Sequence, residues 1–382
     1  MTEQFDVAVI GGGLLGCTTA LFLARAGKRV VVVERRKNIC TQATGVNTGN
    51  LSMMWTRPYL VPYAIEGRNM WATTSDWLGV DLGFRVRGGL KLAFTEAEAV
   101  DMQRDMGEAR DGYGCPIEFL DGEAARRIEP ALTPAVVRAA YCPLDGYANS
   151  LQTGRAFRRV LKRENIQLRL EAAPAALDCG DAGHTLHLPG RRLHARELVV
   201  AGGAWIEEIL QLFGLSYPML CRKSQVIVTE RMPATFSTVI SAALGILSLK
   251  QSDNGTVLIG GGWQGLGDPV RGPVQIVPEN FIGNLRLAHY AIPALKSARI
   301  VRGWLGLEAR APDQQPLLGR VPGHARAWII GAIDTGFTLG PALAKRLSAI
   351  MLGEAEEIAA FDPGRPMPPC PVQPLPVYAD EL

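Results

Sequence analysis

A glycine-rich turn between a buried strand and a helix constrains this chain more than any other feature. Residues 6–10, DVAVI, form a buried-strand pattern that leads directly into GGGLLG at 11–16 and a helical stretch, CTTALFLARAG, that ends at Gly27. A second strand pattern, KRVVVVE, ends in Glu34, about twenty residues beyond the glycines. This order of elements predicts a βαβ unit that binds a dinucleotide.

The spacing of the glycines gives each of them a role. Gly11 permits the tight turn, Gly13 lets the backbone approach a pyrophosphate, and Gly16 lets the helix pack closely on the strand. The helix N-terminus, beside Leu15, offers free amides and a positive dipole to the phosphates. Glu34 is placed to accept hydrogen bonds from the ribose hydroxyls, which disfavours a cofactor with a 2′-phosphate. The turn alone separates neither NAD from FAD nor a binding site from a plain glycine-rich turn.

Composition argues against several other classes of protein. The net charge of +3 gives no broad electrostatic footprint for nucleic acid, and seven scattered cysteines without a CxxC pair suggest neither a disulfide framework nor a zinc site. We therefore expect no metal. The acidic N-terminus and the lack of a long apolar run indicate a cytoplasmic protein without a transmembrane segment, which partners could hold at the inner membrane.

Further segments point to one cofactor. ATGVNTGN at 43–50, LVVAGGAW at 198–205 and GAIDTGFTLGP at 331–341, together with GGGLLG and the Glu34-Arg35 pair, resemble the D-amino-acid oxidase superfamily of FAD enzymes, which includes glycine oxidase and sarcosine oxidase. The resemblance spans nearly the whole chain and implies noncovalently bound FAD. The additional cofactor contacts that it implies are Arg35, Thr44, Asn47, Gly49, Pro174, Gly202, Trp205, Gly331, Gly336, Phe337 and Thr338.

The resemblance also implies an α/β and α+β fold: a Rossmann-like FAD-binding domain with a discontinuous substrate domain on a mainly antiparallel sheet. A proline-dense tail should lie extended, either as a loose end or as an arm that docks on a partner subunit. The expected boundaries are 1–82, 146–217 and 301–364 for the FAD-binding domain, 83–145 and 218–300 for the substrate domain, and 365–382 for the tail.

Longer segments resemble a narrower group within the superfamily. TRPYLVPYAIEG (56–67), SQVIVTE (224–230) and PDQQPLLG (312–319) are similar to the β subunits of opine oxidases, hydrogen cyanide synthase and D-hydroxyproline dehydrogenase. This similarity implies a catalytic subunit with an α partner, either alone or together with a γ partner. Because the chain has no cysteine cluster for an iron–sulfur centre, a second flavin or such a centre in a partner, or an external acceptor, would carry the electrons onward.

One departure from the superfamily concerns the substrate. Many relatives carry WxGLRPxTPD, whose arginine pairs with a substrate carboxylate, whereas this chain has WLGLEARAPD with Glu308 at that position. Glu308 would bind a cationic substrate group, Arg310 would replace the lost arginine, or the site would no longer bind a simple amino acid; the alternative is a structural Glu308–Arg310 pair. The candidate substrate-binding residues are Glu308, Arg310, Asp334 and Thr335.

These features predict FAD-dependent oxidation of a secondary amine, such as an opine, by hydride transfer to flavin N5 and hydrolysis of the imine. No catalytic acid or base is required beyond orientation, and no catalytic side chain is assigned. A guanidinium-bearing opine would meet Glu308 or Asp334. The alternatives are a stand-alone D-amino-acid, glycine or sarcosine-type oxidase that uses oxygen, and a non-catalytic subunit that retains FAD.

Overall fold

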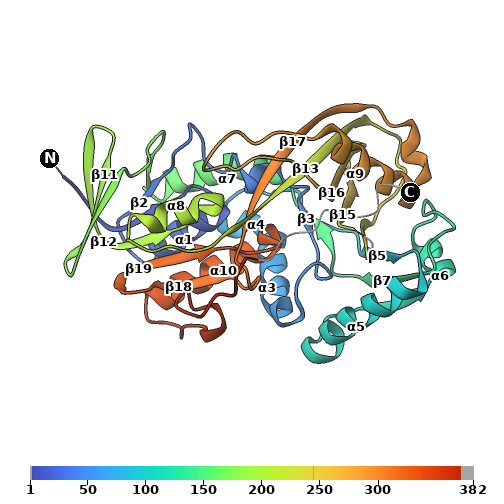
Figure 1. Ribbon diagram of the computed structural model, residues 1–382, viewed down its shortest axis with the longest axis horizontal. Coiled ribbons are helices and arrows are strands. Elements are labelled where there is room, and N and C mark those ends of the chain that lie inside the picture. Colours follow the sequence, from blue (N-terminus) through green and yellow to red (C-terminus); the bar gives the residue numbers. More distant parts are fainter. Residues whose placement is uncertain (1, 244, 371–382) are drawn as a thin grey trace.

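The computed structural model describes residues 2–243 and 245–370 and contains two eight-stranded sheets that lie side by side (Figure 1). The first sheet has the order β10-β11-β12-β1-β2-β9, and β19 and β18 extend it from β12. Its strands are β1 (Glu3–Ile10), β2 (Val30–Val33), β9 (Gln167–Arg169), β10 (Ala176–Gly180), β11 (Gly183–Leu188), β12 (Arg191–Val200), β18 (Leu317–Val321) and β19 (His324–Gly331). The predicted βαβ unit is therefore present, with β1 and β2 parallel.

Buried aliphatic side chains explain why these strands lie at the centre of the sheet. All four valines of β2 are buried, as expected for a parallel strand that is covered on both faces. Alternate residues of β1 enter two different cores: Val7 and Val9 pack in one, and Ala8 and Ile10 pack in the other. The helices associated with this sheet are α1 (Leu14–Arg25), α7 (Ser150–Arg163), α8 (Ile206–Gln211) and α10 (Gly336–Met351).

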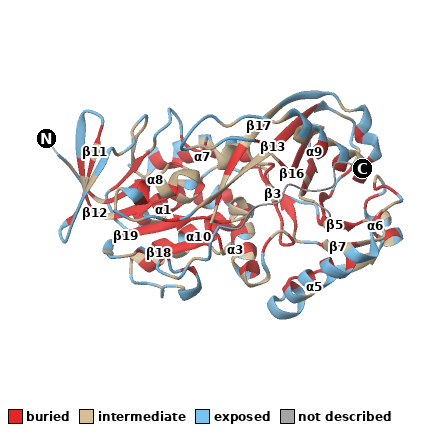
Figure 2. Ribbon diagram, in the orientation of Figure 1, coloured by how far each residue is buried: buried red, intermediate tan, exposed pale blue. Residues whose placement is uncertain are grey.

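The second sheet has the order β17-β13-β16-β15-β14-β5-β7-β6 and is antiparallel except for the β14–β5 pair. Its strands are β5 (Gly89–Ala93), β6 (Glu118–Asp121), β7 (Arg138–Cys142), β13 (Leu220–Arg231), β14 (Val239–Ala242), β15 (Leu247–Gln251), β16 (Thr256–Gln264) and β17 (Ile300–Arg310). The helices α5 (Glu96–Tyr113), α6 (Gly122–Ile128) and α9 (Pro278–Ala291) accompany it. Figure 2 shows buried strands in both sheets and an exposed outer side on α5.

Short elements join the two sheets. A three-stranded sheet comprises β3 (Asn50–Leu51), β4 (Arg85–Val86) and β8 (Gly146–Tyr147). The connecting helices are α2 (Ala43–Val46), α3 (Val61–Ala72) and α4 (Thr74–Trp77), and the 3₁₀ turns are Pro58–Leu60, Gly203–Trp205, Pro293–Ser297 and Ala359–Phe361. Among the described residues, we find no helix with the length and apolar character that crossing a membrane requires.

Two of the expected boundaries differ from the observed arrangement. The strand β17 belongs to the second sheet, because it pairs along its length with β13, so that sheet ends near residue 310 and not at 300. The expected tail begins with an anchored residue: the Arg365 side chain, 12% exposed, donates to Asp313 at 2.7 Å. The segment 371–382 lies outside the described residues.

Candidate active site

A deep pocket of about 340 Å³ opens between the two sheets. Its wall includes the ends of β1, β2 and β12, the N-termini of α1 and α10, the helix α2, and residues of β13 and β17. This volume is within the range of small-molecule sites. The pocket therefore brings together segments from the beginning, middle and end of the chain.

The glycine turn forms one wall of the pocket. A Cβ atom on Gly13 would have only Thr44 Oγ1, at 3.6 Å, within 4 Å, so this backbone is open to a ligand. A Cβ atom on Gly11 would lie 2.2 Å from the carbonyl oxygen of Ala201, and one on Gly16 would lie 2.0 Å from that of Gly11. Gly11 also has a φ of +116°, which favours glycine. Gly13 thus faces the pocket, whereas Gly16 serves packing and does not line it.

Charged and aromatic groups surround the end of the pocket near β2. The Glu34 carboxylate accepts a hydrogen bond from the Gly12 amide at 2.8 Å. The Arg35 and Arg36 guanidinium groups lie 5.1 and 5.3 Å from the centre of the Trp205 ring, and Pro174 lines the same end. An acid, an aromatic ring and an open backbone fit the ribose and adenine of a dinucleotide.

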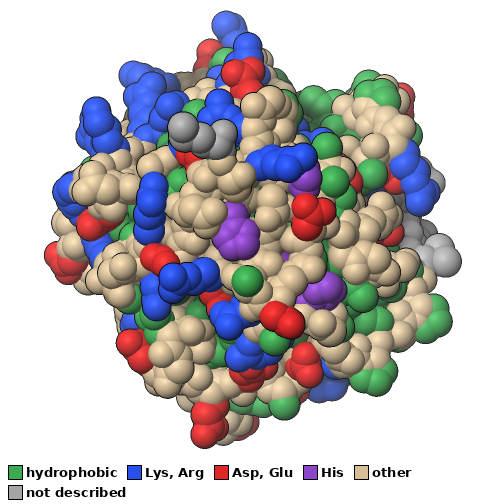
Figure 3. All heavy atoms as spheres, turned by 90° about the vertical axis from the view of Figure 1, so that its left-hand side faces the viewer, with side chains coloured by type: hydrophobic (Ala, Val, Ile, Leu, Met, Phe, Trp, Pro, Cys, Tyr) green, Lys and Arg blue, Asp and Glu red, His purple; other side chains and the backbone are tan. Residues whose placement is uncertain are grey.

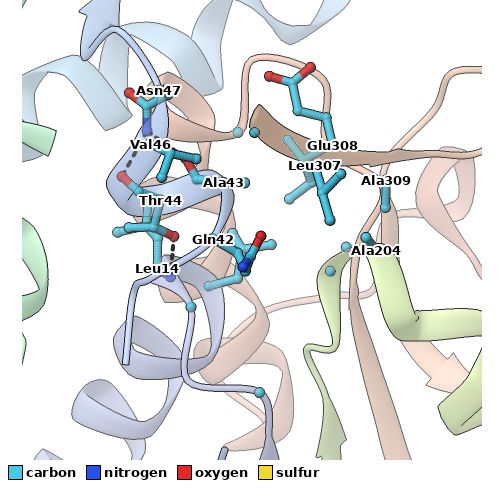
Figure 4. A pocket seen from close by; sticks show the side chains of 18 of the residues that line it. Leu14, Gln42, Ala43, Thr44, Val46, Asn47, Ala204, Leu307, Glu308 and Ala309 are labelled. Carbon is cyan, nitrogen blue, oxygen red and sulfur yellow. Dashed lines mark hydrogen bonds between the residues drawn. The ribbon is translucent and has the colours of Figure 1, made fainter. Parts of the chain in front are cut away.

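The α2 segment forms the middle of the pocket. The Thr44 hydroxyl accepts from the Leu14 amide at 3.0 Å, and Asn47 donates to the carbonyl groups of Ala43 and Thr44, each at 2.8 Å. Figure 4 shows this segment on one side of the cavity and Glu308 on the other. Gly49 follows the segment but does not line the pocket.

A strained loop brings the start of α10 to the pocket. Ala332 and Thr335 have φ values of +53° and +54°, which non-glycine residues rarely adopt. The loop places Gly336 and Phe337 in the pocket wall, and no described residue accepts a hydrogen bond from their amides. Trp71 supports the loop by donating to the Phe337 carbonyl oxygen at 2.7 Å. Free amides at a helix N-terminus favour a negatively charged ring edge or anion.

Four charged groups cluster where β13, β17 and the loop before α10 meet at the pocket, and we call Arg222, Glu308, Arg310 and Asp334 the charge quartet. Arg222 lies 3.5 Å from Glu308 and 3.6 Å from Asp334. Arg310 donates to Asp334 at 2.6 Å and to Gln314 at 3.0 Å. Burial raises the pKa of the Glu308 carboxyl, an effect that Arg222 opposes. The alternative expectation, a structural ion pair between Glu308 and Arg310, is not observed, because Glu308 faces Arg222 instead.

The lining of the pocket shows where each predicted residue lies but not what role it has. The predicted residues that line it are Gly11, Gly13, Leu15, Glu34, Arg35, Thr44, Asn47, Pro174, Gly202, Trp205, Glu308, Gly331, Asp334, Thr335, Gly336, Phe337 and Thr338. The predicted residues outside its lining are Gly16, Gly49 and Arg310. Arg310 reaches the site only through Asp334, so it is not the replacement arginine in the cavity.

Sequence reasoning missed the contribution of β13. Arg222, Ser224 and Val226 alternate along this strand and all line the pocket. A strand over 220–231 puts these three residues on one face, but LCRKSQVIV has no apolar–polar alternation that marks this face as the one toward the pocket. Asn50 was also missed; its Oδ1 atom is buried without a hydrogen-bond partner, while its amide donates to Ser248 at 2.9 Å.

Histidines gather at the far end of the first sheet and not in the pocket. Figure 3 shows several of them on that face. The strands β11, β12 and β19 carry His184, His187, His194 and His324. Among the described residues, no group of three or more histidine, cysteine or acidic side chains has an arrangement that could hold a metal ion.

The sequence profile of one family matches almost the entire chain. This family, described as FAD dependent oxidoreductase and abbreviated DAO, matches residues 6–350. The chain belongs to this family. The open backbone at Gly13, the acid at Glu34 and the free amides of α10 fit its FAD cofactor.

Individual DAO-family relatives agree with the profile. A glycine oxidase of Geobacillus kaustophilus is 26% identical over 372 residues, which cover 92% of this chain and 96% of that protein. An opine oxidase subunit of Rhizobium meliloti is 26% identical over 354 residues, covering 88% and 90%. The HcnC subunit of the hydrogen cyanide synthase of Pseudomonas aeruginosa is 25% identical over 395 residues, covering 89% and 92%.

A solved DAO-family structure confirms the predicted fold. The crystal structure of the Geobacillus kaustophilus glycine oxidase superposes with a TM-score of 0.86 at 25% identity, covering 96% of this chain and 100% of that one. The predicted combination of a Rossmann-like FAD-binding domain and a substrate sheet is therefore confirmed. The chain is an FAD-dependent oxidoreductase that acts on the CH–NH bond of amino or imino acids.

Proposed function

We propose that this DAO-family enzyme oxidises a secondary amine, such as an opine or a related imino acid, as the catalytic subunit of a hetero-oligomeric dehydrogenase. The observation that carries the proposal is Glu308 in the pocket wall, which favours a substrate with a cationic group beyond the reacting nitrogen. The similarity to an opine oxidase subunit supports the same substrate class.

The chain's own residues would hold the cofactor and orient the substrate. FAD, when bound, supplies the acceptor for the hydride that leaves the substrate α-carbon. Gly13, Glu34 and Thr44 would hold the dinucleotide, and the Gly336 and Phe337 amides would face the ring edge. The walls formed by β13 and β17 would fix the amine and limit access of water. Water then splits the product imine into an amine and a 2-oxo acid.

Of the two carboxylates in the charge quartet, one is more available to a cationic substrate than the other. Asp334 already accepts from Arg310 at 2.6 Å, whereas the Glu308 carboxylate has no hydrogen-bond partner among the described residues. Glu308 is therefore the better partner for a substrate guanidinium, whereas Asp334 is already paired with Arg310.

Anaerobic reduction of the bound flavin tests the substrate class. The FAD-loaded protein would be mixed with opines, cyclic imino acids, D-amino acids and glycine, and bleaching of the yellow absorption would be followed. We expect opines or imino acids to bleach it fastest. Faster reduction by primary amino acids would contradict the proposal, and no reduction by any amine would favour a non-catalytic subunit.

Co-purification tests the subunit role. The proline-rich segment 371–382 is the candidate docking arm, and a deletion should start there because Arg365 is anchored to Asp313. Removal of 371–382 is expected to weaken assembly with partner subunits while FAD remains bound. A chain that is isolated alone and is fully active with an artificial acceptor would contradict this role.

A stand-alone oxidase is the second candidate function, because the glycine oxidase relative matches over 96% of its own length. It predicts stoichiometric hydrogen peroxide from the isolated chain in air. Rapid substrate reduction without peroxide would instead favour a partner or external acceptor.

A further inference from the structure

Arg222 presents a guanidinium to the pocket without making a hydrogen bond to any described residue. Its side chain is 12% exposed, and its nearest charged partners are Glu308 at 3.5 Å and Asp334 at 3.6 Å. We propose that Arg222 binds the carboxylate of the substrate. This inference rests on the proposed oxidation of an amino or imino acid and assigns the residue that selects for the acid group.

Unused hydrogen-bond donors are the first argument. A guanidinium has five N–H donors, and donors removed from water without a partner cost free energy. The separations of Arg222 from Glu308 and Asp334 both exceed the usual N–H···O range of about 2.7–3.2 Å. The two carboxylates therefore hold Arg222 electrostatically but leave its donors available to a ligand that enters the cavity.

The other arginines near the pocket are less suited to this task. Arg310 is already hydrogen-bonded to Asp334 and Gln314 and does not line the pocket. Arg35 and Arg36 lie beside Trp205, at the end that would hold the adenine half of the cofactor. Arg222 is thus the guanidinium that a substrate carboxylate can approach.

The strand register explains how the cationic group comes to lie on β13. Arg222 lies directly opposite Glu308 in the antiparallel β13–β17 pair. Opposite residues on one face of such a pair have side chains within contact distance, so an arginine at 222 reaches the region beside position 308. The guanidinium is supplied by the neighbouring strand, and Glu308 holds it there.

Charge balance narrows the substrate class. The charge quartet contains two guanidinium groups and two carboxyl groups, and is neutral when both carboxyl groups are ionised. A bare anion would add a negative charge beside Glu308 and Asp334, whereas a zwitterion adds no net charge. The site therefore suits an amino or imino acid whose carboxylate contacts Arg222 and whose cationic group lies toward Glu308.

Ligand binding to the FAD-loaded protein tests the inference without catalysis. Benzoate, a flat carboxylate, and benzamide, its neutral counterpart, would be titrated while the visible spectrum of the flavin is recorded. We expect Arg222→Gln to weaken benzoate binding about 10- to 150-fold and benzamide binding less than about 3-fold, because only benzoate loses a charge-assisted contact. Arg222→Lys should fall between, since lysine keeps the charge but not the planar fork.

Two further variants guard against a folding defect. Arg299→Gln, at a side chain that is 85% exposed, is the matched control and should leave benzoate binding unchanged. The exchange Arg222→Glu with Glu308→Arg should recover at least about 10-fold of the benzoate affinity that Arg222→Glu alone removes, because it returns a guanidinium to the pair.

The outcomes separate this inference from the proposed function. Equal losses for benzoate and benzamide in Arg222→Gln would overturn the role of Arg222. If benzoate binding depends on Arg222 but no amine reduces the flavin, the carboxylate site stands and the proposed oxidation fails. If amines reduce the flavin and Arg222→Gln leaves their KM unchanged, the oxidation stands and the carboxylate site fails.

Discussion

Two parts of the pocket wall differ in the kind of group that they present to a ligand. In one part, the groups come largely from the backbone: the open turn at Gly13 and the free amides of Gly336 and Phe337. In another part, side chains of the charge quartet form or support the wall, and strands β13 and β17 carry three of them, Arg222, Glu308 and Arg310. Backbone groups define a site for an invariant cofactor, whereas side chains can change with the substrate.

The largest expected effect concerns the part built from backbone groups. Gly13→Val should fold, because Gly13 has a φ of −80° and its Cβ direction is open, but the valine methyl groups would occupy the space of the pyrophosphate. We expect the purified variant to lose the yellow chromophore, with FAD affinity lowered by at least about 100-fold. Flavin content per folded protein, with circular dichroism as the folding check, measures this.

A matched glycine shows whether the loss is local. Gly16→Val places atoms against the Gly11 carbonyl oxygen, 2.0 Å from the first Cβ position, and should reduce stability as well as FAD content. A folded Gly13→Val protein with full FAD occupancy would show that the pyrophosphate does not approach this turn.

The same contrast explains what could be predicted from sequence. The βαβ unit was predictable because Gly11, Gly13, Gly16 and Glu34 are local in sequence and each has a separate geometric reason. The charge quartet was not, because Arg222 and Glu308 are distant in sequence and meet only through the β13–β17 register. Glu308 lines the pocket and its binding role stays a prediction, but its partner Arg222 was not foreseen.

Arg310 shows the limit of reasoning from spacing. Its position two residues after Glu308 suggested that it replaces the missing arginine from a shifted position. The Asp334 carboxylate instead holds it outside the pocket lining. That contact depends on the strained loop before α10, which no local pattern specified.

A smaller effect is expected at the part built from side chains. Glu308→Gln keeps the shape but removes the negative charge that would face a cationic substrate group. We expect kcat/KM to fall about 5- to 150-fold for a guanidinium-bearing opine, with much smaller losses for analogues that lack the cation. Steady-state kinetics with paired charged and uncharged substrates measures the difference.

The same variant should affect anionic ligands in the opposite direction. Loss of the Glu308 charge removes an ionic competitor for Arg222, so benzoate binding should be unchanged or tighter. If Glu308→Gln lowers kcat/KM equally for charged and uncharged substrates, Glu308 has a structural role. The contrast between a cofactor-binding and a substrate-binding part of the pocket would then lose its functional support.

The smallest expected effect on activity concerns a buried charge beside the pocket. Lys250 on β15 is 5% exposed, and its ammonium lies 4.3 Å from the centre of the Tyr147 ring. Burial lowers the pKa of Lys250 to about 7, from an ordinary value near 10.5. Between these values the folded state binds fewer protons than the unfolded state, so this residue makes stability rise with pH from about 7 to about 10.

Lys250→Met should therefore stabilise the protein by about 1–4 kcal/mol at pH 6. The loss of the cation–π contact with Tyr147 will reduce this gain. The gain should also shrink as the pH approaches 10. Denaturant unfolding at pH 6, 8 and 10 measures it, with the exposed Lys28→Met as the control. Because Lys250 does not line the pocket, kcat/KM should change less than about 3-fold. A loss of activity comparable with that of Glu308→Gln would instead show that the functional site includes Lys250 on β15 as well as the charge quartet.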